Sequence, residues 1–406
     1  MAKRTGPELT CIDLFAGAGG LSEGLREAGF RSLYANEVIP QYAATFALNH
    51  PGTLVDASDI REVEPAGVRE KLGLARGELD LVAGGPPCQG FSINAPTRSA
   101  EDRRNHLFRD YLRFVEEFRP RAVLIENVPG LVSFGNGATL HAILESLELL
   151  GYSSDVRILY APHYGVPQTR WRTLVIGLRD GGDALAAFPE PRHEAPHRVN
   201  FTSKLGNRNL VVLPTVTNLR GHTTVRDAIG DLPGLKNGEP GAEIKEYPEA
   251  PQNTYQADLR IGSDGVHNHE AISLSRVNLE RLRHIPPGGN WTNIPHDLLP
   301  AGMQRARRTD HTKRYGRANP DGLSSTILTK CDPHWGAYFH YSQDRAFTVR
   351  EAARIQSFPD RYIFTGSRVA QFEQVGNAVP PMLGRAVGNS IRSVLSVEGS
   401  ALDIAT

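Results

Sequence analysis

The residue with the clearest chemical potential is Cys88, which lies in the stretch Gly-Gly-Pro-Pro-Cys-Gln-Gly-Phe-Ser at positions 84–92, directly after the apolar run 79–83. Two prolines stiffen this loop and the glycines leave its backbone open to a close ligand, so the thiol is presented as a nucleophile would be. The alternative is a tight turn in which the cysteine is a small buried apolar residue. Other motifs in the sequence are needed to distinguish a nucleophilic cysteine from a buried apolar one.

Three charged side chains follow short apolar or extended segments. Glu126 comes directly after the predicted buried strand 122–125. Arg170 and Arg172 are two residues apart on a segment that we expect to be extended, which places both guanidinium groups on the same side. The alternative for either arginine is that it only pairs with a carboxylate.

A glycine-rich turn, Phe-Ala-Gly-Ala-Gly-Gly at 15–20, follows the predicted strand 9–15 and precedes apolar residues at helical spacing. Strand, glycine turn and helix bring a nucleotide-like cofactor close to backbone amides. Glu37, about 20 residues further on, ends a second predicted strand and can accept hydrogen bonds from ribose hydroxyls. The glycines at 17, 19 and 20 lack the full Gly-x-Gly-x-x-Gly spacing, which argues against a nicotinamide dehydrogenase.

Short apolar strands alternate with helices over the first 180 residues, and this predicts an α/β fold with a doubly wound, mainly parallel sheet. We expect strands at 31–35, 79–83, 122–125, 156–160 and 173–178, a third weak strand closed by Asp59 and Ile60, and helices at 107–118 and 140–147. In such sheets ligands bind at the carboxyl ends of the strands. Phe15, Glu37, Cys88 and Glu126 all fall at these ends.

The alternation fades after Gly181-Gly182 into a region rich in proline, glycine and polar residues, where we place a second domain. Within it a basic strip carries six cations against one acid, Asp310. Its members are Arg305, Arg307, Arg308, Lys313, Arg314 and Arg317. The strip is either a solvated charged face or a set of phosphate contacts. Regularity returns with predicted helices at 350–356 and after Pro380-Pro381.

Five motifs in one order resemble the DNA (cytosine-5)-methyltransferase family: the glycine turn at 15–20, the Cys88 loop, Glu-Asn-Val at 126–128, Gln-Thr-Arg-Trp-Arg at 168–172, and Gln-Val-Gly-Asn-Ala-Val-Pro-Pro at 374–381. The resemblance spans both ends of the chain and favours the nucleophile for Cys88. It implies an S-adenosylmethionine-dependent methyltransferase fold with a smaller, irregular target-recognition domain. We expect residues 1–185 and 371–406 to form the catalytic domain, and 186–370 the recognition domain, braced by the helix at 349–357.

The resemblance also assigns roles. It implies catalytic roles for Cys88, Glu126, Arg170 and Arg172, and contacts of Gln89 and Ser92 with the DNA backbone. It implies S-adenosyl-L-methionine as cofactor, bound by Phe15, Ala16, Gly17, Gly19, Gly20, Leu21, Glu37, Val38, Asp59, Ile60, Pro87, Leu107, Asn377 and Val379. In the mechanism it implies, a Cys88 thiolate adds to carbon 6 of a flipped cytosine, Glu126 stabilises the charge on ring nitrogen 3, and no side chain is assigned as the base that removes the carbon 5 proton.

Composition sets the remaining limits. The 45 basic residues balance the 45 acidic ones, so DNA contact has to come from local clustering, and three unpaired cysteines favour a reducing cytosol over disulfides or a metal site. We expect a cytoplasmic monomer without membrane contact, acting on double-stranded DNA and paired with a cognate restriction endonuclease. The alternatives are a tRNA cytosine-5 methyltransferase and a catalytically silent DNA-binding regulator.

Overall fold

The structure is a computed structural model that describes residues 8–87 and 107–403, with the side chains of 397–403 left out. The described residues fall into two compact units. The first unit runs to Tyr164 and adds Trp171–Leu219 and the chain from Pro381 onward, and the second unit contains Gly165–Arg170 and Arg220–Pro380. None of the helices described is long and apolar enough to cross a membrane.

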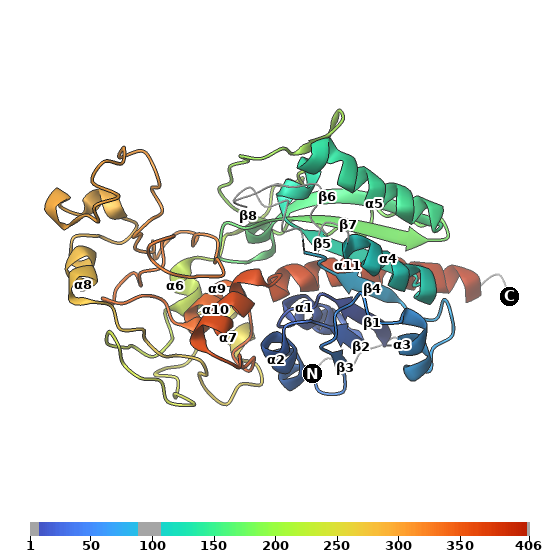
Figure 1. Ribbon diagram of the computed structural model, residues 1–406, viewed down its shortest axis with the longest axis horizontal. Helices are drawn as coiled ribbons and strands as arrows, with labels where there is room; N and C mark the ends of the chain where they lie inside the picture. The colour runs from blue at the N-terminus through green and yellow to red at the C-terminus, as the bar shows by residue number, and fades with distance from the viewer. Residues whose placement is uncertain (1–7, 88–106, 404–406) are drawn as a thin grey trace. The chain divides into compact units, whose positions relative to one another are not determined.

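A seven-stranded sheet forms the centre of the first unit (Figure 1). Its order is β3-β2-β1-β4-β5-β7-β6, and only β7 runs antiparallel to its neighbours. The strands are β1 Leu9–Leu14, β2 Phe30–Asn36, β3 Leu54–Asp56, β4 Leu81–Gly84, β5 Ala122–Asn127, β6 Tyr152–Tyr160 and β7 Trp171–Arg179. The predicted mainly parallel α/β sheet is confirmed.

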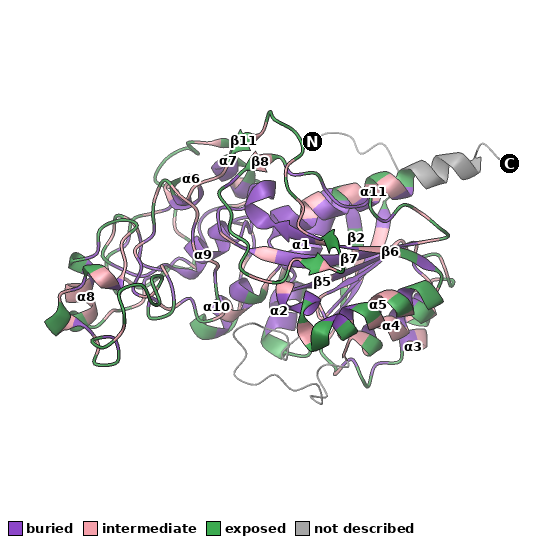
Figure 2. Cartoon of the chain, turned by 90° about the horizontal axis from the view of Figure 1, so that it is seen from above, coloured by how far each residue is buried: buried purple, intermediate pink, exposed green. Residues whose placement is uncertain are grey.

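Helices cover both faces of this sheet, with α4 and α5 on one side and α1 and α11 on the other (Figure 2). The helices of the first unit are α1 Gly20–Ala28, α2 Pro40–Asn49, α3 Pro65–Lys71, α4 Leu107–Phe118, α5 Ala138–Leu149 and α11 Pro381–Asp403, with 3₁₀ turns η2 Pro129–Val132, η3 Phe134–Gly137 and η4 Ala161–Tyr164. The core between them is apolar and buried, which is why β4 and β5 read as continuous hydrophobic runs.

The last helix, α11, packs against α1, although more than 350 residues separate the two in sequence. The approach is close because glycines face each other. A Cβ added at Gly24 would lie 2.3 Å from the carbonyl oxygen of Pro381, and one at Gly388 would lie 2.7 Å from the Cβ of Ala28. The helix α11 therefore belongs to the same compact unit as α1.

The strand predicted to close at Asp59 and Ile60 ends earlier. β3 stops at Asp56, and Asp59 and Ile60 lie in the turn that follows. The backbone N–H of Ser58 donates to the Asp56 carboxylate at 2.8 Å, so the chain turns as soon as the strand is complete. The prediction was right about the strand and wrong about its end.

The first unit also contains part of the proline-rich region, as the short strands β8 His193–Glu194, β9 Lys204–Leu205 and β10 Arg208–Asn209. This region belongs to the first unit because the backbone of residues 210–212 pairs with β6. The Ile158 N–H donates to the Leu210 carbonyl at 2.7 Å, and the Val212 N–H donates to the Ile158 carbonyl at 3.0 Å. The compact units thus change at 219/220 and 380/381, where the predicted domain boundaries were 185/186 and 370/371.

The second unit contains short elements: β11 Arg220–Gly221, α6 Val225–Ile229, α7 Thr254–Arg260, α8 Arg276–Arg283, η5 Trp291–Asn293, η6 His296–Leu298, α9 Val349–Ile355 and α10 Arg368–Asn377. The predicted helix at 349–357 is α9, which begins with a capping box in which Thr348 and Glu351 bond each other's backbone N–H. α10 was not predicted. It belongs here because a Cβ at Gly376 would lie 2.5 Å from the backbone of Leu328 and Thr329.

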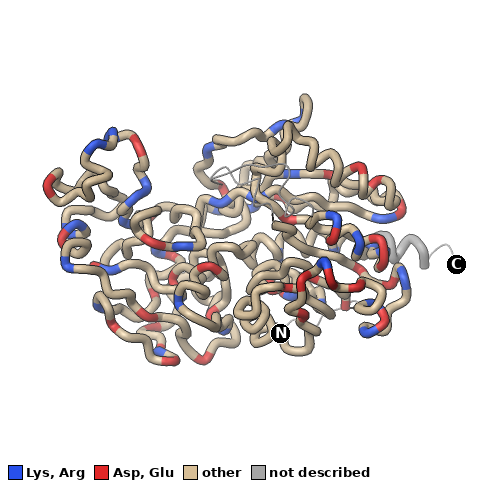
Figure 3. Tube along the Cα trace, viewed as in Figure 1, with Lys and Arg blue, Asp and Glu red and all other residues tan. Residues whose placement is uncertain are grey.

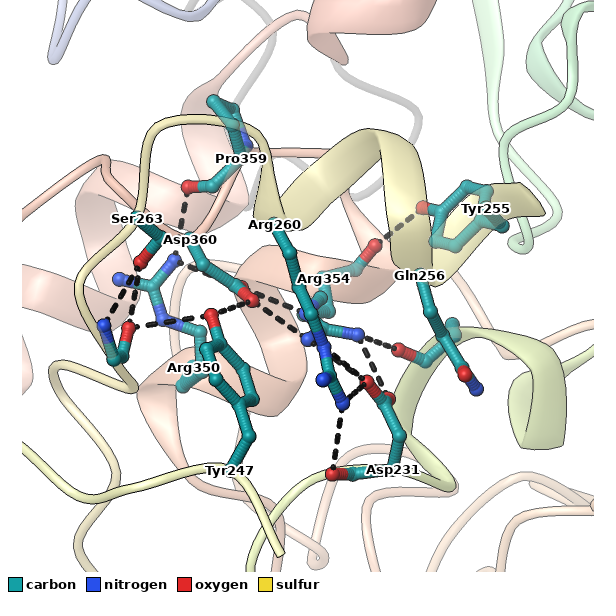
Figure 4. Close-up of polar contacts among 12 residues, drawn as sticks. Asp231, Tyr247, Tyr255, Gln256, Arg260, Ser263, Arg350, Arg354, Pro359 and Asp360 are labelled. Carbon is teal, nitrogen blue, oxygen red and sulfur yellow. Dashed lines mark hydrogen bonds and ion pairs between the residues drawn. The ribbon is translucent and has the colours of Figure 1, made fainter. Parts of the chain in front are cut away.

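Charged side chains, fully buried, tie the second unit together (Figure 4). Arg354 donates to Asp360 through Nε at 2.7 Å and to Asp231 through Nη1 at 2.9 Å, and the side chains of all three are 0% exposed. The hydroxyl of Tyr247 donates to Asp360 at 2.6 Å. Because buried charges are tolerated only when paired and hydrogen-bonded, this network fixes α9 against the segments around it.

Candidate active site

The sheet register brings the carboxyl ends of four strands to one level. Leu14 of β1 pairs with Asn36 of β2 and with Gly84 of β4, and Gly84 pairs in turn with Ile125 of β5. The residues that follow are Phe15, Glu37, Gly85 and Glu126, which therefore emerge along one edge of the sheet. This is the edge where an open α/β sheet binds its ligands.

Glu126 forms an ion pair with Arg172 at this edge. Nε of Arg172 lies 2.5 Å from Oε1 of Glu126, and the two side chains are only 11% and 12% exposed. Arg172 also donates from Nη1 to its neighbouring Trp171 carbonyl at 2.9 Å. Burial lowers the pKa of Arg172, an effect that the Glu126 carboxylate opposes. Oε1 is thus engaged with the arginine, which leaves Oε2 for another partner.

The backbone that leads to Cys88 passes directly in front of Oε2. A Cβ added at Gly85 would lie 3.1 Å from that oxygen. Next to it, Nδ2 of Asn127 donates to the Pro86 carbonyl at 3.1 Å and so ties the loop to the end of β5. Cys88, Gln89 and Ser92 themselves lie outside the described residues. The structure therefore brings the start of the nucleophile loop against Glu126.

The other two cysteines are unsuited to nucleophilic chemistry. Cys11, on β1, is 1% exposed and Cys331 is 3% exposed. Burial raises the pKa of both thiols, and nearby carboxylates, among them Asp13 for Cys11, raise it further. Since the thiolate is the reactive form, neither residue has the chemistry that the sequence assigns to Cys88.

The glycine turn after β1 adopts the backbone that close ligand approach needs. Phe15 and Gly17 have φ angles of 58° and 57°, and a Cβ at Gly17 would meet nothing within 4 Å. Gly19, at φ 92°, is the N-cap of α1, and among the described residues no side chain caps that helix. The first amides of α1 are therefore left for an anionic group such as a ligand carboxylate.

Glu37 closes this part of the site. Its carboxylate accepts hydrogen bonds from the backbone N–H of Gly17 and of Ile39, both at 2.9 Å, and the residue is 8% exposed. Burial raises its pKa, and the two hydrogen bonds oppose that shift. Each oxygen keeps a lone pair for a ribose hydroxyl. An uncapped helix, open space at Gly17 and this carboxylate fit a ligand that carries a carboxylate and ribose hydroxyls.

The remaining predicted cofactor residues occupy varied positions. The N–H of Ala16 donates to the Asn36 carbonyl at 3.0 Å, Leu21 is buried in α1, and Val38 is 53% exposed next to Glu37. Pro87 and Leu107 are half-buried, and Leu107 packs against the core. Gly20 is the first residue of α1. Asn377 ends α10 and Val379 follows it, both in the second unit.

Asp59 and Ile60, the two residues assigned to an adenine ring, differ in their surroundings. The Asp59 carboxylate accepts from Nε of Arg61 at 2.9 Å and from its backbone N–H at 3.1 Å. These hydrogen bonds lower the pKa of Asp59 to about 2, which keeps it an acceptor. Ile60 is 3% exposed and lies within the apolar core.

Arg170 and Arg172 have separate partners. The Arg170 side chain is buried in the second unit, where it donates to the carbonyls of Ile327 at 3.1 Å, Gly376 at 2.8 Å and Ala378 at 2.9 Å. It thereby ties the end of α10 to the segment at 327. These contacts give Arg170 a structural role in linking backbone segments, whereas Arg172 contacts Glu126 directly.

Sequence reasoning missed one acid at this edge. Asp13 on β1 is 1% exposed and accepts a hydrogen bond from the Ser22 hydroxyl at 2.6 Å. Burial raises the pKa of Asp13 to about 7; the Ser22 hydrogen bond opposes this, and the charges of Glu37 and Glu126 add to it. The signal was a carboxylate inside an apolar strand, two residues before the glycine turn begins at Phe15.

The predicted basic strip lies on a loop region of the second unit, where Lys and Arg recur (Figure 3). Four of its members are exposed: Arg305, Arg307, Arg308 and Lys313. Arg317 differs, because its guanidinium donates to the carbonyls of His340 and Tyr341 and pairs with Asp344. Within the described residues, no group of three or more His, Cys, Asp or Glu side chains could hold a metal ion.

Comparison with known proteins agrees with this geometry. A family model described as C-5 cytosine-specific DNA methylase matches residues 9–393. The chain is 38% identical to the type II methyltransferase M.AgeI of Thalassovita gelatinovora, over 95% of this chain and 99% of that protein, and 34% identical to M1.HphI of Haemophilus parahaemolyticus, over 94% and 86%. A solved structure of a DNA modification methyltransferase encoded within an E. coli prophage superposes with a TM-score of 0.71 at 23% identity, covering 96% of this chain and 99% of that one.

The strand order, the glycine turn after β1 and the carboxylate after β2 define the α/β fold of S-adenosylmethionine-dependent methyltransferases. The chain belongs to the C-5 cytosine-specific DNA methylase family and is a DNA (cytosine-5)-methyltransferase.

Proposed function

We propose that this enzyme methylates carbon 5 of a cytosine flipped out of double-stranded DNA, through a covalent adduct with Cys88. The observation that carries the proposal is the approach of the Cys88 loop to Glu126, with a Gly85 Cβ position 3.1 Å from Oε2. A carboxyl group beside the start of a loop that carries a cysteine suits a base that needs attack at carbon 6 and stabilisation at nitrogen 3. A stacked base cannot reach such a site, so it has to be extruded.

The cofactor proposed is S-adenosyl-L-methionine, which supplies the methyl group when bound. The first amides of α1 would hold its carboxylate, and Glu37 would accept hydrogen bonds from its ribose. Asp59, kept ionised by Arg61, would accept from the adenine amino group. The open space at Gly17 allows the backbone of the turn to contact the ligand directly. Asn377 and Val379 complete the set that we propose.

Three residues of the protein would act in the reaction: Cys88, Glu126 and Arg172. The Cys88 thiolate would form a bond from sulfur to carbon 6, and the electron pair of the ring double bond would then form the bond from carbon 5 to the methyl group that the cofactor supplies. Oε2 of Glu126 would face nitrogen 3 and, when the carboxyl group is in its acid form, would donate a hydrogen bond to it, while Arg172 holds Oε1 and fixes the orientation of the carboxyl group. Loss of the carbon 5 proton then re-forms the double bond and expels the thiolate.

We further propose that this is the modification enzyme of a restriction-modification system, since relatives at 38% and 34% identity are named type II methyltransferases. Gln89 and Ser92 would contact the backbone of the flipped nucleotide. Arg305, Arg307, Arg308, Lys313 and Arg314 would contact DNA. Arg317, whose guanidinium is used within the second unit, would position this strip without touching DNA.

The test is methyl transfer from labelled S-adenosylmethionine to a mixed-sequence duplex and, in parallel, to tRNA. We expect label in DNA only, and bisulfite sequencing should place 5-methylcytosine in one short sequence context. Label in tRNA alone would contradict the DNA substrate. Specific DNA binding without label in either substrate would support a silent regulator instead.

A further inference from the structure

An exposed aromatic side chain stands beside the basic strip of the second unit. Trp335 is 54% exposed, which is unusual for the largest side chain that a protein can bury. The guanidinium carbon of Arg314 lies 4.9 Å from the centre of its ring system. This is a cation–π contact at the protein surface, and Trp335 belongs to none of the motifs identified from the sequence.

The two side chains stand on chain segments that are held rigidly together. The Tyr315 N–H donates to the Pro333 carbonyl at 2.7 Å, and the Gly316 N–H donates to the Gly336 carbonyl at 3.3 Å. A Cβ at Gly316 would lie 2.5 Å from the Cβ of Ala337, so only glycine permits this approach. The segments on either side of the pair therefore cannot drift apart without breaking backbone hydrogen bonds.

A tight turn fixes Trp335 from its other side. The Trp335 N–H donates to the Asp332 carbonyl at 2.9 Å, and the His334 N–H donates to the Asp332 carboxylate at 2.8 Å. The His334 ring meets the ring of buried Tyr315 edge-on, with 4.9 Å between centroids. The indole is thus presented outward on a preorganised turn, a placement that burial of apolar surface does not explain.

Arg314 differs from Arg317 and Arg308 in how its guanidinium is used. Arg317 donates to carbonyls and pairs with Asp344, and Arg308 donates to the Thr292 carbonyl at 3.3 Å. Within the described part of the chain, no carboxylate or carbonyl accepts a hydrogen bond from the Arg314 guanidinium. Its guanidinium therefore lies over the indole in a cation–π contact, and its donors remain open to an external acceptor.

We propose that Arg314 reads a guanine of the target site in the major groove, and that Trp335 is the residue that positions it. The O6 and N7 acceptors of guanine match the two parallel donors of a guanidinium, and this is the commonest specific contact to a base edge. Stacking on a rigid aromatic face fixes the plane of the fork before DNA binds. The inference rests on the proposed function, since it names how that same enzyme selects its site.

The experiment compares variants on a duplex library with randomised positions around the methylated cytosine, read by bisulfite sequencing. Arg314→Lys keeps the charge and removes the fork. We expect kcat/KM at the preferred site to fall about 5- to 150-fold, with the requirement for guanine relaxed at one position. Non-specific DNA binding and its dependence on salt should not change.

Two further variants separate positioning from simple structural loss. Trp335→Ala should relax the same position as Arg314→Lys, to a smaller extent, and Trp335→Phe should restore most of the preference because it keeps an aromatic face. Arg307→Ala is the matched control from the same strip. It should weaken binding to all sequences equally and reduce the salt dependence, as loss of a phosphate contact does.

The outcomes distinguish this inference from the proposed function. A wild-type enzyme that places no methyl group on DNA cytosine overturns the proposed function itself. If the wild-type enzyme methylates a defined site and the Arg314→Lys variant keeps the same requirement for guanine, only the inference is overturned. An Arg314→Lys variant that loses activity uniformly across all sequences also overturns it, since that pattern belongs to a phosphate contact. Circular dichroism of each variant confirms that it is folded.

Discussion

The pairing of Glu126 with Arg172 is the residue-scale feature on which the proposed chemistry depends. Arg172 occupies Oε1 at 2.5 Å and leaves Oε2 facing the loop at Gly85. A carboxyl group with one oxygen fixed and one free presents a single hydrogen-bonding direction to a base. Because the pair is nearly buried, its orientation is preorganised and little reorganisation accompanies the reaction.

Replacing Glu126 with Gln tests this role. The amide keeps the shape but loses the acid that stabilises charge at nitrogen 3, so we expect kcat to fall about 10²- to 10³-fold with the Kd for S-adenosylmethionine unchanged. Single-turnover methyl transfer and calorimetry measure the two quantities. Glu145→Gln on the exposed face of α5 is the control and should match wild type. Equal losses of kcat and cofactor affinity would point to a structural role.

Asp13 gives a pH prediction. Its pKa is raised to about 7 from an ordinary 3.8, so the stability it contributes is present below about pH 4 and lost as pH rises through 7. Asp13→Asn cannot ionise. Relative to this variant, wild type should lose on the order of 3 kcal/mol between pH 4 and pH 7. Urea unfolding across that range measures the difference, which would stay constant if Asp13 were ionised throughout.

Some site residues could be predicted from the sequence because local geometry alone determines them. The glycine turn and Glu37 follow from spacing after β1, and Gly17 and Glu37 do contact each other. The contacts of Arg170 could not be predicted, since its acceptors lie at 327, 376 and 378, which tertiary folding alone brings to it. Asp13 was missed because an acid in an apolar strand has no signature until its burial is known.

At the scale of elements, strands such as β4 and β7 were predictable because they are buried on both faces and read as apolar runs. α10 was missed because its residues carry a weak apolar pattern and it is held by contacts of Gly376 with the segment at 328–329. The end of β3 was misplaced because the turn at Asp56 and Ser58 is set by one side-chain hydrogen bond. Short strands in the proline-rich region form only by pairing, which no local pattern reveals.

The buried network around α9 makes an element-scale prediction. Arg354→Met leaves Asp231 and Asp360 buried without their shared partner, so we expect the free energy of unfolding to fall by about 3 to 5 kcal/mol. Arg226→Met is the control, because Arg226 and Asp321 form an exposed pair, and it should cost less than about 1 kcal/mol. Urea unfolding followed by circular dichroism compares them, and similar losses in both variants would contradict the role of the network.

At the scale of the whole molecule, 45 basic and 45 acidic residues cancel, so DNA binding depends on where the charges gather. We expect Arg305→Ala with Arg307→Ala to lower the slope of log Kd against log salt by about 1.8, since each phosphate contact contributes about 0.9. Binding titrations at several salt concentrations measure it. Lys71→Ala, which removes one exposed charge from α3, should leave the slope unchanged. An unchanged slope in the double variant would show that these arginines form a solvated charged face and do not contact phosphates.

The central claim is the covalent adduct of Cys88 with carbon 6 of cytosine, and trapping that adduct tests it most directly. A duplex with 5-fluorocytosine at the methylated position offers no carbon 5 proton to remove, so an adduct that forms cannot resolve. With S-adenosylmethionine present, we predict a denaturation-resistant complex whose mass is that of protein plus DNA plus one methyl group, linked through the peptide containing Cys88. Methylation of ordinary DNA without any such complex, or a link through Cys11 or Cys331, would contradict the account.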